Sequence, residues 1–501
     1  MNLKNSILSY IIKKRENDIN YFMRNPHEIQ EKVFQELIAK GRLSLFGEEH
    51  HFVEIKSYKK FTEHVAIRTY EELFPYINQI RCGGENVLWP DKVKWFAKSS
   101  GTTNAKSKFI PISKESLYNS HFKAGKDMLA LYCNNFPEKK IFDGKGLMLG
   151  GSQEKNITCD FIDGDLSAIL IDNFPFWVKM HQNPNSETVL LSDWELKIKR
   201  ITAQLLNENI TNITGVPSWM YLVLQNIVKE KGVKTLSEVW PNLELYIHGG
   251  INFSSYKKNF DKLIGDHKIN YLEIYNASEG FFGIQDQYES SELLLMLDHG
   301  IFYEFIPIQE FRSGGKQAIT LEDVKKDQEY VLIISTCSGL WRYLIGDTIK
   351  FTSINPYRII ISGRTQSYIN MFGEELMVGN ANEAINHTCK ITSSKIIDYT
   401  ASPILYNEIS GTHEWIIEFE KAPSDISEFQ KILDSKLKEI NSDYAAKRDK
   451  DLLIKIPIIK TVSRGTFYNW SRGKNRLGGQ YKIPKLCNDR IFANELSKYE
   501  N

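Results

Sequence analysis

Apolar residues recur at helical spacing near the start of the chain. Asn25 is a favoured N-cap, Pro26 suits the first helical position, and Gly41 can end a helix. The pattern therefore predicts a helix over residues 25–41, and the segment before it is also expected to be an amphipathic helix. The apolar stripe of the predicted helix consists of Ile29, Val33, Phe34, Leu37 and Ile38.

Helical and strand-like segments alternate through the middle of the chain. Ser113 is expected to cap a helix that carries His121 on its apolar face, where a packed or half-exposed histidine is favoured over a metal ligand. Further helices are predicted near residues 189–206 and 218–229. Short apolar runs between the helices predict buried strands at Gly146–Leu149, Leu243–His248 and Tyr271–Tyr275. This alternation indicates an α/β fold with helix-flanked sheets.

The pattern changes between residues 293 and 364. Strand-like runs follow one another closely there, which predicts antiparallel strands and a β-barrel-like part of the large domain. The runs are Leu293–Leu297, Ile301–Ile306, Tyr330–Ser335, Leu340–Ile345 and Arg358–Ser362.

The chain restarts after Gly363-Arg364. A helix over 375–389, a strand over 415–419 and a helix over 424–440 follow, which is enough for a small α+β domain. We therefore expect an N-terminal domain over residues 1–363 and a smaller C-terminal domain over residues 364–501.

Composition narrows the choice of partners. The 501 residues carry a net charge of +1, and 42% of them are hydrophobic, which is ordinary for a soluble globular protein. A balanced charge argues against binding to nucleic acid or to an acidic membrane. The N-terminal apolar run is short and interrupted by charge, so neither a signal peptide nor a membrane span is expected.

The cysteines indicate a reduced setting. None is spaced for a zinc site, and no disulfide framework is apparent. We expect a cytoplasmic protein. The cysteines are Cys82, Cys133, Cys159, Cys337, Cys389 and Cys487.

The segment WFAKSSGTTNAKSKFIPIS, residues 95–113, combines hydroxyl groups, Gly101 and two lysines, Lys106 and Lys108. Such a loop offers N–H groups, O–H groups and positive charge to a polyphosphate. It does not match the Walker loop, because no second glycine precedes a Lys-Ser/Thr pair. The alternative is a flexible polar turn.

Two later clusters follow predicted strands. After the first, Tyr275 offers a flat face to a base and Glu279 could hold a divalent cation that bridges phosphates. Alternatively, Tyr275 belongs to the core and Glu279 is solvated. In GLWRYLIGDT, residues 339–348, Asp347 could accept hydrogen bonds from a ribose diol, or the segment is a hairpin turn.

A basic stretch lies near the C-terminus. Seven lysines and arginines fall between Arg464 and Lys485, with no acidic residue among them. A solvated basic face is the favoured interpretation over a nucleic-acid patch. A mobile domain could also bring one of these lysines to a negatively charged intermediate.

Taken together and in this order, the clusters resemble the adenylate-forming superfamily. More narrowly, the chain resembles the Gretchen-Hagen, or auxin-responsive promoter, family of acyl-acid amido synthetases, including its bacterial members. The resemblance covers nearly the whole chain. It rests on SSGTT with Lys108, GVPSW at 215–219, HGG at 248–250, YNASEGFFG at 275–283, GLWRYLIGD at 339–347, Gly363-Arg364, FGEE at 372–375 and QYKIP at 480–484.

The resemblance implies roles for matching positions. Asn276 and Ala277 belong to the implied ATP-binding motif, Arg364 assists near the hinge, and Lys482 could reach the active site when the C-terminal domain closes. Lys108 and Lys482 are the implied catalytic lysines. The other implied ATP contacts are Ser99, Ser100, Gly101, Thr102, Thr103 and Lys108 at the phosphates, Gly249, Gly250 and Tyr275 at the adenine, Ser278 at the α-phosphate, Glu279 at magnesium, and Asp347 at the ribose.

Two positions depart from the family pattern. The phosphate loop has residues 104–108 as NAKSK, where relatives usually have a glycine and a proline, so the loop could be stiffer or differently curved. Asn276 replaces a usual glycine, and asparagine tolerates a positive φ better than most residues. Neither departure removes a charged group.

The implied reaction uses ATP and Mg²⁺ to convert a carboxylic acid to an acyl-adenylate, which an amine, expected to be an amino acid, then attacks. The C-terminal domain is expected to rotate between the two half-reactions. Two alternatives stay open, an acyl-CoA synthetase and a nucleotide-binding protein without turnover. The sequence does not identify the acid, the acceptor or the oligomeric state.

Overall fold

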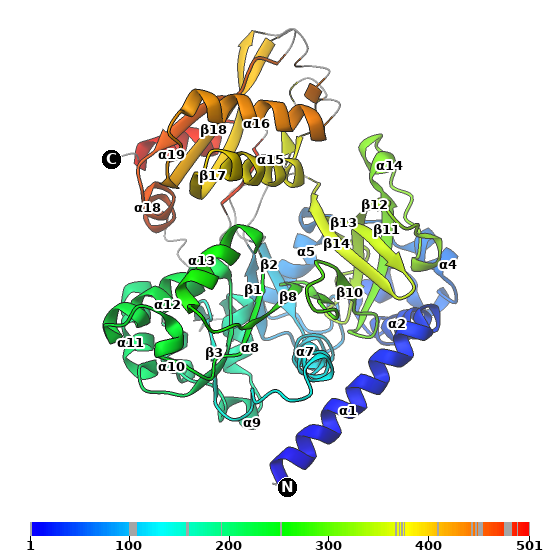
Figure 1. The fold of residues 1–501 in the computed structure, drawn as a ribbon. Coiled ribbons are helices and arrows are strands. Elements are labelled where there is room, and N and C mark those ends of the chain that lie inside the picture. The colour runs from blue at the N-terminus through cyan, green and yellow to red at the C-terminus, as the bar shows by residue number, and fades with distance from the viewer. Residues whose placement is uncertain are drawn as a thin grey trace. The chain divides into compact units, whose positions relative to one another are not determined.

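A computed structural model describes most of the chain in two compact units (Figure 1). The described residues are 3–99, 108–156, 160–191, 193–250, 253–365, 368–369, 371, 374, 376–407, 410–441, 444–445, 448, 454–474, 483–487 and 489–499. The first unit holds residues 1–345 and 349–360, and the second holds 346–348 and most of the chain from 361 onward. Each unit is described by itself.

The large unit is built on a sheet that has ten strands in the described part of the chain. One half is parallel, since β3 pairs with β6, β6 with β7, and β7 with β8. Helices connect these strands, as the sequence pattern predicted. The parallel strands are β3 (Lys145–Met148), β6 (Ile210–Thr214), β7 (Leu245–Gly249) and β8 (Asn270–Ala277).

The other half of the sheet contains the strands predicted between residues 293 and 364. It also contains β9, which was not predicted. Within the described residues these strands do not close into a barrel, because they continue the parallel half in one open sheet with β11 and β3 at its two ends. The β-barrel-like expectation is therefore wrong. The strands are β9 (Gly280–Ile284), β10 (Leu293–Leu295), β11 (Ile301–Pro307), β12 (Glu329–Thr336), β13 (Tyr343–Ile354) and β14 (Tyr357–Arg364).

A second, smaller sheet was not predicted. Strands β1 (Trp95–Ser99) and β2 (Lys108–Ile112) are antiparallel, and β1 also lies parallel to β5 (Phe161–Gly164), which pairs with β4 (Gln153–Asn156). The guanidinium of Arg81 covers the Phe109 ring at 3.7 Å. This contact ties the small sheet to the preceding helix.

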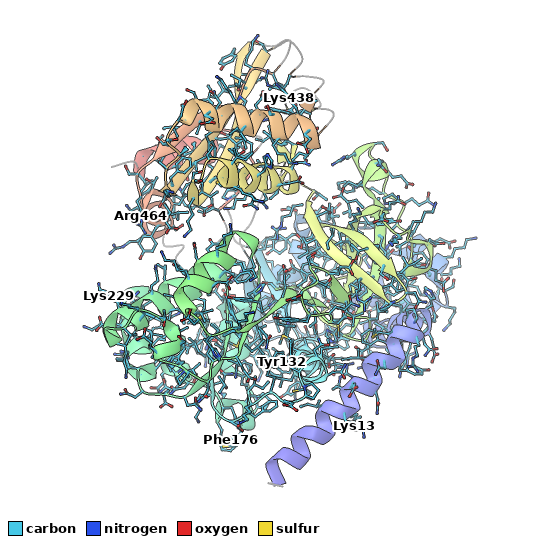
Figure 2. All side chains as sticks on the ribbon, in the orientation of Figure 1. Lys13, Tyr132, Phe176, Lys229, Lys438 and Arg464 are labelled. Atoms are coloured by element: carbon cyan, nitrogen blue, oxygen red, sulfur yellow. The ribbon has the colours of Figure 1, made fainter. Side chains whose placement is uncertain are left out.

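Helices surround both sheets of the large unit. In Figure 2 the labelled Tyr132 lies in the interior, where it is 1% exposed, and Phe176 lies at the surface, 77% exposed. The longer helices are α1 (Leu3–Arg24), α2 (Pro26–Gly41), α5 (Tyr70–Arg81), α7 (Phe122–Asn135), α11 (Trp194–Leu205), α12 (Pro217–Lys231) and α13 (Ser254–Ile264). The shorter ones are α3 (Leu45–Glu49), α4 (Tyr58–His64), α6 (Lys114–Ser116), α8 (Leu166–Asp172), α9 (Phe176–Lys179), α10 (Ser186–Val189) and α14 (Ile308–Arg312).

The caps of two predicted helices differ in how they work. Ser113 caps its helix as expected, because its Oγ accepts from the Ser116 N–H at 2.9 Å. Asn25 holds the N-cap position of α2, but its amide donates to the Tyr21 carbonyl of α1 instead. Gly41 is the last residue of α2, and its side-chain position is filled by the Trp341 ring. Glycine is therefore needed there for close packing.

Helix predictions near residues 113 and 189 are correct in place but not in continuity. A π-helical turn, η2 (Leu117–His121), separates α6 from α7. The segment predicted as helix over 189–206 consists of α10 and α11 with a break between them. His121 is buried, as expected for a packed residue, and burial lowers its pKa to about 3.

The smaller unit is a three-stranded sheet covered on both faces. Trp415 and Ile417 pack toward α15 and α16, whereas Ile416 packs with Trp470 of α18 and Phe492 of α19. The elements are β15 (Tyr368–Ile369), β16 (Leu376–Met377), α15 (Val378–Ile391), β17 (Lys395–Asn407), β18 (Ser410–Lys421), α16 (Ile426–Ile440), β19 (Ile458–Val462), α18 (Thr466–Gly473) and α19 (Ile491–Leu496). The fold is thus α/β with a smaller α+β unit, as predicted.

Among the helices that the structure describes, none is both long and apolar enough to cross a membrane.

Candidate active site

The four parallel strands of the large sheet end at one edge. Because parallel strands share a direction, the residues that follow β6, β7 and β8 emerge side by side. This edge is where ligands bind in open α/β sheets. The predicted HGG and YNASEG segments both lie here, after β7 and in the turn between β8 and β9.

Gly249, at the end of β7, allows a close approach to β8. A Cβ atom at this position would lie 2.5 Å from the Ile274 carbonyl oxygen. Gly250 follows with a φ of +82°, which favours glycine. Glycine at these two positions is compatible with the adenine contact that the resemblance implies.

The strand-to-turn segment after Ile274 contains a register shift between Tyr275 and Asn276. Tyr275 is 5% exposed and packs against Phe282 with ring centroids 4.8 Å apart, so its ring belongs to the core. Asn276 pairs with Phe281 in the ladder and is not among the residues with positive φ. Position 276 therefore does not require the tolerance of asparagine for a positive φ.

Glu279 lies in the turn that joins β8 to β9, after Ala277 and Ser278, and is 7% exposed. The alternative of a solvated Glu279 is therefore wrong. The Tyr343 hydroxyl points to Glu279 Oε1 at 3.5 Å. Burial first, and then the charge of Glu279, raises the pKa of Tyr343 well above its usual range. The tyrosine therefore stays protonated and can only donate to the carboxylate.

Lys108 lies beside Tyr70 at the start of β2. Its Nζ lies 5.5 Å from the centre of the Tyr70 ring. The Tyr70 hydroxyl also accepts from the Phe109 N–H at 2.8 Å. Both contacts join the start of β2 to α5, whose first residue is Tyr70.

The predicted phosphate loop begins at Ser99 and ends before Lys108, and these two residues pair at the ends of β1 and β2. Residues 100–103 of the motif (Ser100, Gly101, Thr102 and Thr103) lie outside the described residues, as does Lys482. Their proposed contacts stay predictions.

The GLWRYLIGD segment mixes structural residues with candidate site residues. Trp341 donates from Nε1 to the Leu88 carbonyl, at 3.0 Å, and is fully buried. Arg342, with a φ of +44°, breaks the strand predicted over 340–345, so that β13 begins at Tyr343. Arg342 also binds Glu304, with Nη2 2.8 Å from Oε1. The sequence analysis did not predict this buried pair.

Asp347 and Arg364 both belong to the second unit by their contacts. Arg364 Nε lies 2.9 Å from Asp347 Oδ1, and Asp347 is 5% exposed. Asp347 lies within β13, so the hairpin-turn alternative is wrong. The pairing brings together the two residues to which the resemblance assigns the ribose and the hinge.

A buried lysine was missed by the sequence analysis. Lys197 of α11 is 0% exposed and donates to the carbonyls of Gly150 and Gly151, at 2.9 and 3.0 Å, just after β3. Burial lowers the pKa of Lys197 to about 8. Its partners are backbone groups more than forty positions away, which no local pattern reveals.

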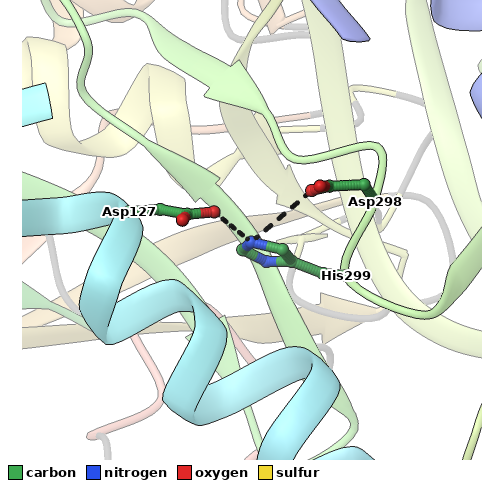
Figure 3. Close-up of side chains that lie close together, drawn as sticks. All are labelled: Asp127, Asp298 and His299. Atoms are coloured by element: carbon green, nitrogen blue, oxygen red, sulfur yellow. Dashed lines mark hydrogen bonds and ion pairs between the residues drawn. The ribbon is translucent and has the colours of Figure 1, made fainter. Parts of the chain in front are cut away.

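A second cluster of ionisable groups comes from α7 and from the segment between β10 and β11. Asp127, Asp298 and His299 have ligand atoms close enough to surround a metal ion (Figure 3). However, Arg15 donates to Asp127 at 2.6 Å, and Lys123 pairs with Asp298 at 2.8 Å. Two cations already offset the two carboxylates, so a divalent ion would add uncompensated charge. The cluster is a hydrogen-bonded network.

Together these features define an α/β protein with a candidate site at the carboxyl edge of a parallel sheet, where the buried Glu279 carboxylate faces the Tyr343 hydroxyl. The chain belongs to the GH3 family. The GH3 family N-terminal domain matches residues 15–269, the central domain matches residues 294–364 and the C-terminal domain matches residues 379–491.

Curated relatives agree with this assignment. Indole-3-acetic acid-amido synthetase GH3.4 of Arabidopsis thaliana is 22% identical, over 93% of this chain and 90% of its own length. Jasmonoyl--L-amino acid synthetase JAR4 of Nicotiana attenuata is 23% identical, over 64% of this chain and 66% of its own length.

Solved structures share the fold. The GH3.15 acyl acid amido synthetase superposes with a TM-score of 0.79 at 16% identity, covering 95% of this chain and 93% of that one. A 2-hydroxyisobutyryl-CoA ligase in the postadenylation state gives a TM-score of 0.57 at 12% identity, covering 94% and 91%.

Proposed function

We propose that this protein is an acyl-acid amido synthetase that works through an acyl-adenylate. The observation that carries the proposal is the match of the chain to all three GH3 domains, supported by the buried Glu279 carboxylate beside Tyr343 in the turn between β8 and β9. The substrates are ATP, a small carboxylic acid and an amine, in the first instance an amino acid.

The first half-reaction opposes two anions, the carboxylate and ATP. A carboxylate oxygen attacks the α-phosphorus, the bond to the pyrophosphate oxygen breaks, and acyl-AMP forms. Lys108 and the loop from Ser99 to Thr103 hold the phosphates, with Ser278 at the α-phosphate. Because the reaction needs positioning and charge stabilisation, no protein nucleophile is required.

We assign the adenosine contacts to the positions that the resemblance implies. Gly249, Gly250 and Tyr275 are assigned to the base, within a site that also includes Asn276 and Ala277. Asp347 and Arg364 are assigned to the ribose.

Glu279 fits a magnesium ion by its chemistry. It is a buried carboxylate, and Mg²⁺ in phosphate sites commonly takes one or two protein carboxylates and completes its shell with water and phosphate oxygens. When bound, such an ion would neutralise charge on the phosphates. Tyr343 orients the carboxylate that would hold it.

In the second half-reaction the amine nitrogen attacks the acyl carbon. The carbon–oxygen bond to AMP breaks, an amide forms, and the amine loses a proton to water. We assign residues 1–363 to ATP and acyl-acid binding and residues 364–501 to a mobile domain that carries Lys482.

One experiment tests the proposal. A library of carboxylic acids is screened for pyrophosphate release, with and without amino acids, and the products are weighed by mass spectrometry. We expect a subset of acids to give pyrophosphate and, with amino acids, the amide. Glu279→Gln should lower the rate by about 100-fold or more, because it removes a charge that is needed in the transition state.

Glu230→Gln, at an exposed position on α12, serves as the control and should keep the wild-type rate. Products that contain CoA instead of an amino acid would identify an acyl-CoA synthetase. ATP binding without pyrophosphate release for every acid would favour a nucleotide-binding protein without turnover.

A further inference from the structure

Figure 3 shows Asp127, Asp298 and His299. This network also reaches the backbone near Glu279 through a contact between His299 and Phe281. His299 Nδ1 lies 3.2 Å from the Phe281 carbonyl oxygen, and its Nε2 lies 2.9 Å from Asp127 Oδ2. Phe281 is only two residues beyond Glu279. The side chains of Asp127, His299 and Arg15 are all buried.

The backbone N–H of Phe281 is also hydrogen-bonded. Its N–H donates to Ser120 Oγ at 3.1 Å, and Ser120 belongs to the π-helical turn η2. Across the ladder Phe281 pairs with Asn276. Both polar groups of one residue are therefore bonded to side chains of other elements, which limits how far the turn at Ser278 and Glu279 can move.

The directions of these bonds follow from their partners. Arg15 donates to both oxygens of Asp127, at 2.6 and 2.9 Å. The Phe281 carbonyl oxygen is an acceptor. The two ring nitrogens of His299 therefore face acceptor oxygens, and Asp127 and Arg15 fix the plane of its ring.

Close packing supports the same segment from the other side. A Cβ atom on Gly280 would lie 2.6 Å from Ile301 Cδ1 of β11. The residue after Glu279 thus packs against the Ile301 side chain of β11, which limits the room in which the turn can rearrange.

We propose that His299 is a positioning residue that, together with Ser120, clamps Phe281 and so fixes the turn that carries Glu279. The role of Glu279 in this inference rests on the proposed function. The clamp itself follows from hydrogen bonds of the described residues. It also connects α1, through Arg15, to the candidate site.

The test compares two substitutions in one network. His299→Phe keeps a ring of similar size but removes both ring nitrogens. Lys123→Met breaks the ion pair with Asp298 and leaves every bond to Phe281 in place. In hydrogen–deuterium exchange, His299→Phe should speed exchange of the amides in 279–284 by about 10-fold, whereas Lys123→Met should leave them unchanged.

Kinetics give the second readout. His299→Phe should lower the rate of ATP–pyrophosphate exchange by about 10- to 100-fold with little change in the KM of the acid. His299→Gln, which keeps one donor, should recover part of this loss. If His299→Phe folds but its amides in 279–284 show the same hydrogen–deuterium exchange as those of Lys123→Met, the proposal is wrong.

Ser120→Ala covers the case in which His299→Phe does not fold. It removes the other bond to Phe281 and leaves the Arg15, Asp127 and His299 contacts intact, and wild-type amide exchange in this variant would also overturn the clamp. A wild-type protein without adenylation activity would refute the proposed function, while the amide exchange would still decide the clamp.

Discussion

Two glutamates near the end of β8 lie in different surroundings. Glu279 lies in the turn, where it accepts from the Tyr343 hydroxyl. Glu273 lies earlier on the strand, where burial raises its pKa to about 7. The carboxyl group of Glu273 therefore gains its charge only near neutral pH.

The raised pKa of Glu273 makes stability depend on pH. In the unfolded chain the carboxyl group returns to a pKa near 4.5. Between pH 4.5 and 7 the folded state therefore binds more protons, and this group's contribution to stability is lost as pH rises through 7. Glu273→Gln should raise the free energy of unfolding at pH 8 by on the order of 1–2 kcal/mol.

At pH 5 the difference between this variant and the wild type should largely disappear. Urea unfolding at pH 5 and pH 8 measures the free energy of unfolding of the variant and of the wild type. Glu36→Gln, at an exposed position on α2, is the matched control. An equal gain for Glu273→Gln at both pH values would contradict the assignment.

At this scale the sequence identified residue types but not their partners. Glu279 and Asp347 stand out because carboxylates follow strand-like runs. Arg342, Lys197 and His299 do not stand out, since each acquires its role from a residue far along the chain. Tyr275 was left between core and base contact, and only packing against Phe282 shows that its ring is in the core.

Among the elements, α2 depends on a contact that its own sequence does not reveal. Its last residue, Gly41, lies against the buried Trp341 ring. Trp341 also packs edge-on against Phe52, with ring centroids 4.7 Å apart. The helix end, the GLWRY segment and the neighbouring η1 turn (Phe52–Glu54) are therefore locked together.

Gly41→Ala should destabilise the protein by about 1–3 kcal/mol, because the added methyl group overlaps the Trp341 ring. Gly125→Ala on α7 is a control for which the expected change in stability has the opposite sign. A Cβ atom there meets nothing within 4 Å, so the higher helix propensity of alanine should stabilise by roughly 0.5–1 kcal/mol. Thermal unfolding checks both, and equal melting temperatures would contradict the packing argument.

Local periodicity was sufficient for several of the longer helices and for the strands of the large sheet other than β6 and β9, which were not predicted. It was not sufficient for how the strands pair. The expected barrel and the open sheet use nearly the same strands, and the difference lies in the pairing of β10 with β14 and β9. The small sheet was missed because its strands, such as β4 with Gln153–Asn156, are short and polar.

At the scale of the whole molecule, the second half-reaction is proposed to need the C-terminal domain. Lys482→Ala should slow one half-reaction by about 10-fold or more, since it removes a positive charge that would stabilise a negatively charged intermediate. The other half-reaction should stay near the wild-type rate. ATP–pyrophosphate exchange measures adenylation, and amide formation from preformed acyl-AMP measures transfer.

Lys474→Ala is the control in the same basic stretch. Lys474 pairs with Glu495 at 2.9 Å at the surface, and exposed pairs of this kind contribute little. Equal losses in both half-reactions of Lys482→Ala, or none, would refute a step-specific role for this lysine.

The pairing of Leu293 in β10 with Ile359 in β14 has a consequence for biosynthesis. While the ribosome has yet to deliver β14, the fully buried β10 has one edge uncovered, although the preceding strands are already available. Nascent chains that stall before about residue 360 should therefore expose an apolar strand edge and engage chaperones. Release from them should coincide with emergence of β14.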